Sequence, residues 1–429
     1  MASIAVIGAG ITGITTAYAL LERGHGVTVI DRHRYPAMET SFANGGQLSA
    51  SNAEVWNSPS TLIKGLKWMF DSSAPLLLNL KPSWHKYSWL AEFIAQIPHY
   101  RANTLATVRL ALEARRHLFA MAETEGIDFN LERRGILHVY RDKADFNRAA
   151  EVNGLLREGG LDRHAVTPEE IKTIEPALQG DYYGGFFTPS DSTGDIHKFT
   201  RGLAAACMRR GARFVCDATV ESAAVADGAV SLVWRRMTEL GTVVERLNAD
   251  AVVVCAGVAS GRFAQMFGDR VNIYPVKGYS ITVSLEDEAS RNAAPWVSLL
   301  DDETKIVTSR LGADRFRVAG TAELNGFNRD IRADRVLPLI EWTRRLFPGV
   351  ATEHVEPWAG LRPMTPSMLP RVGAGRKPRV FYNTGHGHLG WTLSAATAQI
   401  VADATVNGLR ALAPARVRAA VAEPARQAP

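Results

Sequence analysis

The sequence has 429 residues, of which 46% are hydrophobic and 22% charged. This composition is that of an ordinary globular protein with two or three domains. The formal net charge is only +5, and part of the arginine excess lies in the alanine- and proline-rich end, 411–429, which we expect to be a flexible tail. No apolar run approaches the roughly 20 residues of a membrane-spanning helix. These features predict no membrane span and no nucleic-acid-binding surface.

The cysteine content and the N-terminus favour a cytoplasmic protein. Cys207, Cys216 and Cys255 are too few and too scattered for a disulfide framework or a metal site. The N-terminus carries no basic, cleavable signal, because its first apolar run leads directly into a glycine loop that a folded domain would need. We therefore expect no targeting segment and no bound metal.

The first thirty residues have the pattern of a strand, a helix and a second strand. Residues 4–7 are a continuous apolar run of the buried-strand type, residues 27–30 have the pattern of a second buried strand, and an apolar helical pattern lies between them. A G-x-G-x-x-G loop joins the first strand to the helix, where its backbone could approach a pyrophosphate. Asp31 closes the second strand and could accept both ribose hydroxyls, which argues against a 2′-phosphate. This pattern predicts a dinucleotide site and leaves FAD and NAD both open.

After this unit, the sequence predicts mainly helices and then a mixture of strands and helices. Residues 56–150 are rich in tryptophan and contain a long helical pattern at 102–125. The α/β pattern then returns and continues to the end of the chain. We expect helices at 195–210 and from about 391, and strands at 213–216, 251–255, 278–285, 305–309, 316–319 and 380–383.

The turn at 383–392, Asn-Thr-Gly-His-Gly-His-Leu-Gly-Trp-Thr, favours a flavin over NAD. It follows a predicted strand and opens a helix, so its backbone N–H groups form a site that attracts negative charge. A flavin ring gains negative charge at N1 and O2 on reduction, whereas an NAD enzyme has no evident use for such a turn. The alternative is a glycine-rich turn with histidines buried in the core.

Five segments together resemble a known family. They are GAGITG (8–13), ETSFANGGQ (39–47), YPVKGYS (274–280), GLRPMTP (360–366) and the turn at 385–392. In this order they resemble the D-amino acid oxidase, glycine oxidase and sarcosine oxidase superfamily, and within it the small subunit-like D-amino acid dehydrogenases of bacteria. The resemblance covers about residues 1–410. It implies an α/β fold with a discontinuous Rossmann-like FAD-binding domain (1–55, 165–272 and 358–410) and a mixed-sheet substrate domain (56–164 and 273–357).

The resemblance also implies roles for individual residues. Arg362 of the GLRP motif would hold the substrate carboxylate in a bidentate pair, the alternative being an ion pair between domains. His388 matches a substrate-contacting position of glycine oxidase, and Tyr279 would line the active-site wall; packing in the core is the alternative for both. The expected cofactor contacts are Gly8, Gly10, Ile11, Thr12, Gly13, Asp31, Arg32, Ser41, Asn44, Gly45, Gly46, Gln47, Val220, Ala256, Gly257, Gly360, Gly385, Gly387, His388, Leu389, Gly390, Trp391 and Thr392.

The implied activity is oxidative deamination of a small D-amino acid. Hydride transfer from the substrate Cα to flavin N5 would give an imino acid, which hydrolyses to a 2-oxo acid and ammonia. The same fold could act on a cyclic or N-alkylated amino acid such as hydroxyproline or sarcosine, or use oxygen as an oxidase. From other classes, a non-catalytic FAD protein for assembly or membrane recruitment and an NAD-linked dehydrogenase are the alternatives. Relatives have Asp-Gly where this chain has Ser367-Met368, so D-alanine is not assumed to be the best substrate.

The mode of flavin attachment and the electron acceptor rest on the same resemblance. Sarcosine oxidases attach FAD through a cysteine near the GLRP region, where this chain has Met364, so we expect non-covalent FAD. The dehydrogenase relatives pass electrons to a membrane quinone pool. The Trp-, Leu- and Lys-rich stretch 62–90 could rest on the inner face of the cell membrane or pack over the FAD domain. The sequence leaves these two arrangements, the acceptor and the oligomeric state open.

Overall fold

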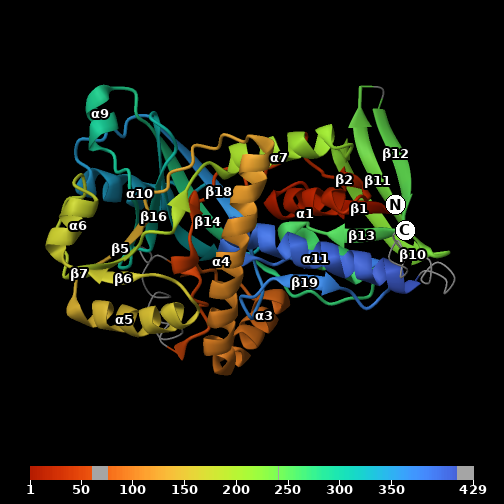
Figure 1. Ribbon diagram of the computed structural model, residues 1–429, viewed down its shortest axis with the longest axis horizontal. Helices are drawn as coiled ribbons and strands as arrows, with labels where there is room; N and C mark the ends of the chain where they lie inside the picture. Colours follow the sequence, from red (N-terminus) through yellow and green to blue (C-terminus); the bar gives the residue numbers. More distant parts are fainter. Residues whose placement is uncertain (60–75, 240, 413–429) are drawn as a thin grey trace, which may run out of the picture.

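The computed structural model describes residues 1–59, 76–239 and 241–412, and its elements form two lobes side by side (Figure 1). The first and last segments of the chain, β1 and α1 in red and α11 in blue, meet in one lobe. The helices are α1 (Ile11–Glu22), α3 (Trp84–Ala95), α4 (Tyr100–Glu125), α5 (Lys143–Glu158), α6 (Pro168–Ile174), α7 (Ile196–Arg209), α8 (Ser260–Met266), α9 (Glu288–Ala293), α10 (Ala333–Leu346) and α11 (Gly390–Leu412).

The lobe that contains both ends of the chain is built on a six-stranded sheet. Its order is β19-β20-β13-β1-β2-β9, parallel throughout except for the edge strand β19. The four inner strands β20, β13, β1 and β2 are almost entirely buried, which is why they are largely apolar. The six strands are β1 (Ser3–Ile7), β2 (Gly26–Ile30), β9 (Arg213–Val215), β13 (Ala251–Val254), β19 (Arg371–Ala374) and β20 (Val380–Thr384).

Two layers cover this sheet. Helices α1, α4, α7 and α11 pack on one face through a core that includes Tyr18, Leu118 and Leu203. A three-stranded antiparallel sheet packs on the other face, where Trp234 is almost fully buried. The three strands are β10 (Ala218–Ala226), β11 (Ala229–Thr238) and β12 (Gly241–Ala249). This βαβ architecture places the N-terminus of α1 at the carboxyl ends of the parallel strands, where such folds bind their ligands.

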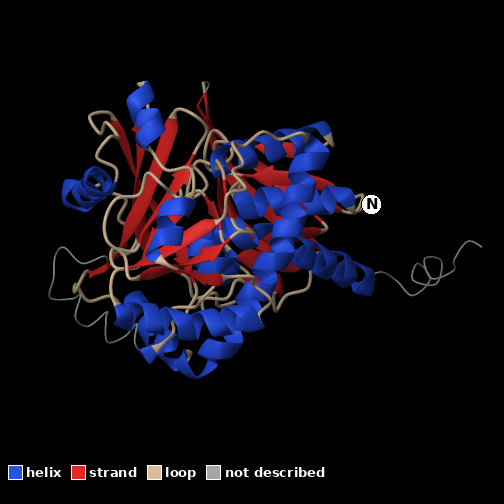
Figure 2. Ribbon diagram, turned by 60° about the vertical axis from the view of Figure 1, so that its left-hand side comes forward, coloured by secondary structure: helices blue, strands red, loops and turns tan. Residues whose placement is uncertain are grey.

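The second lobe is built on a mixed sheet of nine strands with the order β18-β14-β17-β16-β15-β5-β7-β6, and β4 pairs with β17. Helix α10 packs on one face through Leu339 and Trp342. Figure 2 shows the helices of both lobes largely outside the strands. The nine strands are β4 (Leu76–Leu78), β5 (Ile136–Tyr140), β6 (His164–Val166), β7 (Gly184–Thr188), β14 (Tyr274–Ser284), β15 (Ser298–Asp301), β16 (Ile306–Arg310), β17 (Arg315–Leu324) and β18 (Val355–Met364).

Short elements complete the fold near the junction of the lobes. A two-stranded ladder joins β3 to β8 just before α7. The elements are β3 (Gln47–Leu48) and β8 (Ser192–Thr193), with 3-10 helices η1 (Ala50–Asn52), η2 (Ile97–His99), η3 (Gly257–Ala259) and η4 (Gly387–Leu389).

The mixed α/β architecture confirms the expected fold class, but several segments, β6 and α6 among them, lie differently from the expected domain boundaries. β7 and β18, both expected in the FAD-binding domain, belong to the nine-stranded sheet, because β7 pairs with β5 and β6 and β18 pairs with β14 over ten residues. Helix α4, expected in the substrate domain, packs against α11 through the core of the first lobe. The chain therefore crosses between the lobes more often than the sequence suggested.

The tryptophan-rich stretch at 62–90 is only partly described. Residues 62–75 lie outside the described residues. In the described part, β4 pairs with β17, and the Trp89 indole N–H donates to the Met364 carbonyl at 2.8 Å, whereas Trp84 is 86% exposed. Among residues 1–59, 76–239 and 241–412, no helix is long and apolar enough to cross a membrane. Most of the expected tail, 413–429, also lies outside the description; residues 411 and 412 close α11.

Candidate active site

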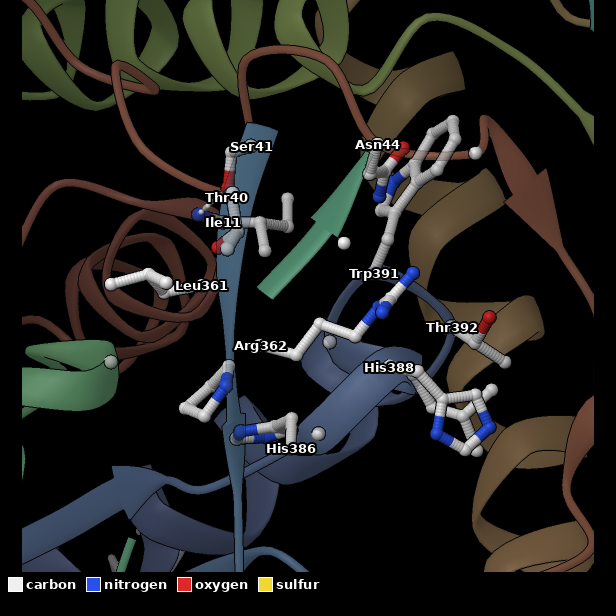
Figure 3. A pocket seen from close by; sticks show the side chains of 18 of the residues that line it. Ile11, Thr40, Ser41, Asn44, Leu361, Arg362, His386, His388, Trp391 and Thr392 are labelled. Carbon is white, nitrogen blue, oxygen red and sulfur yellow. Dashed lines mark hydrogen bonds between the residues drawn. The ribbon is translucent and has the colours of Figure 1, made fainter. Parts of the chain in front are cut away.

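A cavity of about 620 Å³ lies between the two sheets. Its walls come from the loops after β1, β2, β13 and β20 and from the facing strands β14 and β18. Every residue expected to contact the cofactor or the substrate lines this cavity, except Gly13. Figure 3 shows several of these side chains around the cavity, with Arg362 at its centre.

The glycine loop after β1 lines one part of the cavity with closely packed backbone. Gly8 has φ of +109°, and an added Cβ would lie 2.5 Å from the Cys255 carbonyl oxygen. A Cβ on Gly13 would lie 1.9 Å from the Gly8 carbonyl oxygen, so this glycine acts by letting α1 pack against β1. The α1 N-cap, Gly10, makes no side-chain cap, and the first turn holds no acidic residue. The positive end of the helix dipole therefore faces the cavity, which fits a bound pyrophosphate.

Asp31 is fixed at the end of β2 by two backbone donors. Its carboxylate accepts from the N–H groups of Ala9, at 2.6 Å, and His33, at 2.8 Å. Burial raises the pKa of Asp31, while these two bonds oppose the rise. Each carboxylate oxygen keeps a further acceptor direction, which suits a ribose hydroxyl.

Glu39 ties the two lobes together beside this end of the cavity. It pairs with Arg32 and His33 of the first lobe and, at 2.5 Å, with Arg329 from the loop between β17 and α10. Burial alone would raise the pKa of Glu39, but the bonds to His33, Arg329 and Arg32 lower it to about 2. Arg32 is therefore held at the cavity by a carboxylate that stays ionised at neutral pH.

The start of α11 lines another part of the cavity, where the indole N–H of Trp391 is buried. The Trp391 indole packs against Phe129 and Phe199, and its buried N–H has no hydrogen-bond partner within the described part of the chain. Asn44 lies beside Trp391 in Figure 3, and its side-chain oxygen accepts from the Gly46 N–H at 2.9 Å. A buried polar group without a partner is costly unless a ligand completes it. The residues present thus fit a flavin ring over the start of α11.

Arg362 is a cation without an anion. It stands on β18, and its guanidinium lies over Gly278 of the neighbouring strand, where an added Cβ would come within 2.3 Å of Nη2. Its guanidinium makes no ion pair or hydrogen bond with any residue that the structure describes. Burial lowers the pKa of Arg362 to about 10, so it remains charged at neutral pH. A half-buried, unpaired guanidinium facing a cavity is suited to a carboxylate.

His388 stands beside Arg362 with a defined tautomer. Its ring stacks on Trp56 at 4.8 Å, and Nε2 lies 3.2 Å from the Asn52 carbonyl oxygen. Because a carbonyl only accepts, Nε2 must carry the hydrogen. Burial lowers the pKa of His388 to about 4, so the ring is neutral and Nδ1 holds a lone pair. Nδ1 has no hydrogen-bond partner in the described residues.

The second histidine of the turn has a structural partner. His386 Nε2 lies 2.9 Å from Thr397 Oγ1 of α11, and burial lowers its pKa to about 3. His386 also forms an isolated β-bridge with Met364 of β18. It therefore joins the start of α11 to the strand that carries Arg362.

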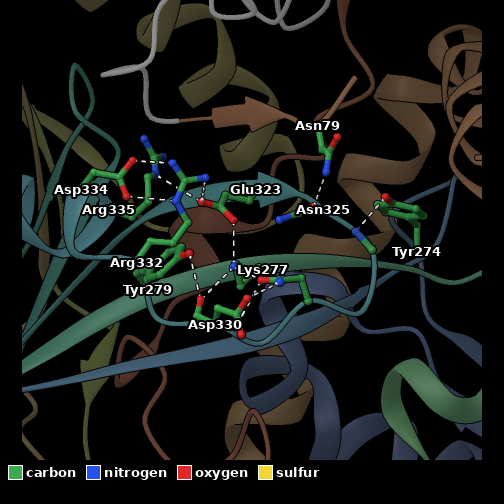
Figure 4. A network of polar contacts seen from close by, with 12 residues as sticks. Asn79, Tyr274, Lys277, Tyr279, Glu323, Asn325, Asp330, Arg332, Asp334 and Arg335 are labelled. Atoms are coloured by element: carbon green, nitrogen blue, oxygen red, sulfur yellow. Dashed lines mark hydrogen bonds and ion pairs between the residues drawn. The ribbon is translucent and has the colours of Figure 1, made fainter. Parts of the chain in front are cut away.

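Tyr279 borders the cavity, but its side chain belongs to a network on β14 and β17 (Figure 4). The ring lies in the apolar core with Ile281, and its hydroxyl donates to the Asp330 carbonyl at 3.4 Å. Burial, followed by nearby Glu323, raises its pKa. The buried pair between Lys277 and Glu323, at 2.9 Å, lies in the same network. Of the two roles left open for Tyr279, packing is the one that these contacts describe.

Sequence reasoning missed one part of the cavity. His138 and Tyr140 of β5 and Arg163 before β6 line its far end, together with Glu54 and Lys305. The alternation of His138 and Tyr140 within the apolar strand 136–140 was an available signal, because alternate residues share one face. No local pattern singles out Arg163.

The two-lobed fold and its site are those of a dinucleotide-dependent oxidoreductase. More specifically, the chain belongs to the DAO family of FAD-dependent oxidoreductases, whose family model matches residues 3–404. FAD is therefore its cofactor, and the alternative of an NAD-linked dehydrogenase is set aside. This agrees with the expectation drawn from the turn at 383–392.

Curated relatives of the same length are D-amino acid dehydrogenases. The chain is 63% identical over 409 residues to D-amino acid dehydrogenase 3 of Mesorhizobium japonicum, covering 95% of this chain and 98% of that protein. It is 43% identical to the D-amino acid dehydrogenase of Paramagnetospirillum magneticum, over 93% and 94% of the two chains. These names and the family confirm that the chain is an oxidoreductase enzyme and rule out the non-catalytic alternative.

Solved structures share the fold at low sequence identity. Glycine oxidase from Geobacillus kaustophilus superposes with a TM-score of 0.71 and 22% identity over 95% of both chains. L-proline dehydrogenase from P. horikoshii gives a TM-score of 0.70 and 17% identity, over 95% of this chain and 94% of the other. These similarities support the two-lobed fold alone.

Proposed function

We propose that this chain oxidises the Cα–N bond of a D-amino acid, using non-covalently bound FAD, to give a 2-oxo acid and ammonia. We further propose that a quinone, rather than oxygen, accepts the electrons. The unpaired guanidinium of Arg362 in the cavity is the observation that carries the proposal. Two relatives named D-amino acid dehydrogenase, at 63% and 43% identity, support the choice of substrate class.

Arg362 would bind the substrate carboxylate. A planar guanidinium offers two parallel N–H donors to a carboxylate, which fixes its orientation as well as its position. Gly278 makes this possible, because any larger residue would occupy the place of the guanidinium. With the carboxylate fixed, the Cα is restricted to a small volume of the cavity.

His388 would bind the substrate amine. Its Nδ1 lone pair is an acceptor next to Arg362, and a neutral amine can donate an N–H to it. Arg362 and His388 would then fix the carboxylate and the amine of one α-amino acid. Two fixed substituents orient the third bond of Cα, which is the bond to the hydrogen that leaves.

The reaction needs little acid–base chemistry from the protein. When bound, FAD takes up two electrons and the Cα hydrogen as a hydride. The nitrogen lone pair then forms the C=N bond of an imino acid, and the amine loses one proton. Water hydrolyses the imino acid to the 2-oxo acid and ammonia. The residues of the cavity would bind and orient the substrate and limit its contact with water.

Non-covalent attachment is supported by the positions of the described cysteines. Cys255 and Cys207 are buried, with their sulfurs directed to Thr16 Oγ1 and the Ile14 carbonyl. Cys216 is half-buried after β9, and the GLRP strand contains Met364 where sarcosine oxidases have a cysteine nearby. Acid precipitation tests this directly, because non-covalent FAD leaves with the supernatant. Yellow colour in the pellet would contradict the proposal.

The reaction is tested by measuring its products. Purified holoenzyme with a D-amino acid and an artificial acceptor should give the 2-oxo acid and ammonia in equal amounts. A short-chain ubiquinone should replace the artificial acceptor, whereas dissolved oxygen should give little hydrogen peroxide. Turnover of a cyclic or N-methylated amino acid in place of every primary D-amino acid would leave the fold and Arg362 in their roles but replace the substrate class.

A further inference from the structure

The cavity continues beyond Arg362 and His388 into a polar region that the reaction at Cα does not use. We define the distal chamber as the part lined by Glu54, His138, Tyr140, Arg163, Asp302 and Lys305. β5 supplies His138 and Tyr140, and the turn between β15 and β16 supplies Asp302 and Lys305. The presence of several charged groups in one part of the cavity indicates a ligand with a charged or polar end.

Arg163 is the group in the distal chamber whose charge is not matched. It is only 2% exposed, and its guanidinium stacks over the Phe186 ring at 4.7 Å. Its side chain interacts with the Tyr140 hydroxyl, and its Nε has no hydrogen-bond partner in the described residues. No carboxylate of residues 1–59, 76–239 or 241–412 lies within ion-pair distance of it. A buried charge without a counter-ion is costly unless a ligand supplies one.

The acids of the distal chamber have partners of their own. Glu54 accepts from the Tyr100 hydroxyl at 2.7 Å, and burial raises its pKa. Asp302 pairs with Lys305 at 2.5 Å. Burial, with the charges of Arg163 and Lys305, holds the pKa of His138 well below its usual value, so this ring is neutral. Arg163 is therefore the cation that remains available to a ligand.

The short helix η1 contacts both the distal chamber and the place of the reaction. His388 bonds to the Asn52 carbonyl, and the preceding residue, Ser51, bonds through Oγ to His138 Nε2 at 3.1 Å. Ser51 and Asn52 both belong to η1. Arg362 and Arg163 thus stand at two places along one continuous cavity, one beside His388 and the other near His138.

We propose that Arg163 binds a second anionic group of the substrate, so that the preferred substrate is an amino acid with a second carboxylate. This inference rests on the proposed function, since Arg362 would hold the α-carboxylate of the same molecule. The second carboxylate would accept hydrogen bonds from Arg163 in the distal chamber, with Tyr140 beside it. A neutral substrate of equal length would leave the Arg163 charge unmatched.

The test is a substrate series with increasing spacer length, assayed on the full holoenzyme with an artificial acceptor. D-Aspartate, D-glutamate and D-2-aminoadipate are compared with D-asparagine, D-glutamine and D-norvaline. We expect at least one diacid to exceed its neutral counterpart by about tenfold or more in kcat/KM. Arg163→Met should remove that preference while changing kcat/KM for D-norvaline less than about threefold. Arg163→Lys, which keeps the charge without the planar fork, should retain part of the preference.

The matched control is Arg148→Met, because Arg148 also lines the cavity but already pairs with Asp145 on α5. It should leave the diacid preference unchanged. Flavin content and thermal midpoint are measured for each variant, and the wild-type series remains informative if Arg163→Met does not fold. Preference for D-arginine or D-lysine, no diacid preference, or an equal loss for all substrates in Arg163→Met would each overturn the inference. If no amino acid is oxidised at all, the proposed function itself fails.

Discussion

The two ends of the cavity are built in different ways. At the nucleotide end, GAGITG and Asp31 come from one βαβ unit of about thirty residues, and their charged groups are already paired with backbone donors or ions. At the substrate end, Gly278, Arg362, His388 and Arg163 come from four distant segments, and Arg362 and Arg163 have no anionic partner among the described residues. We propose that the first end would hold FAD by local backbone geometry. The second end would be completed by the substrate, so we expect substrate specificity to be set there.

The largest expected loss of bound FAD lies at the nucleotide end. Gly13→Ala would place a Cβ 1.9 Å from the Gly8 carbonyl oxygen, so α1 must move away from β1. Overpacking of this kind costs roughly 1–3 kcal/mol, occasionally more, and we expect the variant to lose most of its FAD and all activity. The measurement is flavin content and thermal midpoint after purification. Gly154→Ala in α5, which has open space, is the control. Full FAD content in Gly13→Ala would show that close packing at Gly13 is not needed for FAD binding.

At the substrate end, Arg362→Met should abolish most activity and leave FAD bound. Losing one partner of a buried charged pair costs about 2–5 kcal/mol, which is roughly a 30- to 4,000-fold loss in kcat/KM. Arg376→Met, an exposed arginine outside the cavity, is the control and should be unchanged. Steady-state kinetics with a D-amino acid provide the measurement. Wild-type kinetics in Arg362→Met would show that the carboxylate binds elsewhere.

Gly278→Ala should act through Arg362 without removing its charge. The added Cβ takes the place of the guanidinium, which must adopt a different and less favourable side-chain conformation. We expect a loss of about tenfold in kcat/KM, from roughly 1–1.5 kcal/mol, with unchanged flavin content. The double variant with Arg362→Met should lose no more than Arg362→Met alone, because both changes act on one interaction. Additive losses in kcat/KM would show that Gly278 does not act through Arg362.

The smallest expected effect at neutral pH concerns stability, and it grows as the pH falls. Burial lowers the pKa of His386 to about 3, below the usual value near 6.5. The unfolded state therefore binds more protons than the folded state between these values, and the free energy of unfolding falls as pH falls from about 6.5 toward 3. One such group contributes at most about 1.4 kcal/mol per pH unit. Urea unfolding of the wild type and of His386→Asn at several pH values measures the difference. If the free energy of unfolding changes with pH by the same slope in both proteins, the assignment to His386 is wrong.

The comparison also explains which features were predictable. The βαβ unit and the turn at 385–392 were predicted well, because strand, loop and helix follow one another in the sequence. Arg362 was predicted from its motif. Gly278, over which its guanidinium lies, is 84 positions earlier in the chain, and their contact depends on the pairing of β14 with β18. Arg163 could not be predicted, since its neighbours Tyr140 and Phe186 come from β5 and β7. The predicted domain boundaries near β7 and β18 differ from the structure for the same reason, because pairing with distant strands places these two strands in the second lobe.

The most direct test of the central claim is an anaerobic visible spectrum of the purified protein during titration with enantiomeric amino acid pairs. The band near roughly 450 nm of oxidised flavin should disappear with at least one D-amino acid and persist with its L-enantiomer. The same D-amino acid should leave the spectrum of Arg362→Met unchanged at equal concentration. A flavin spectrum that no D-amino acid bleaches, or that both enantiomers bleach equally, would contradict the account.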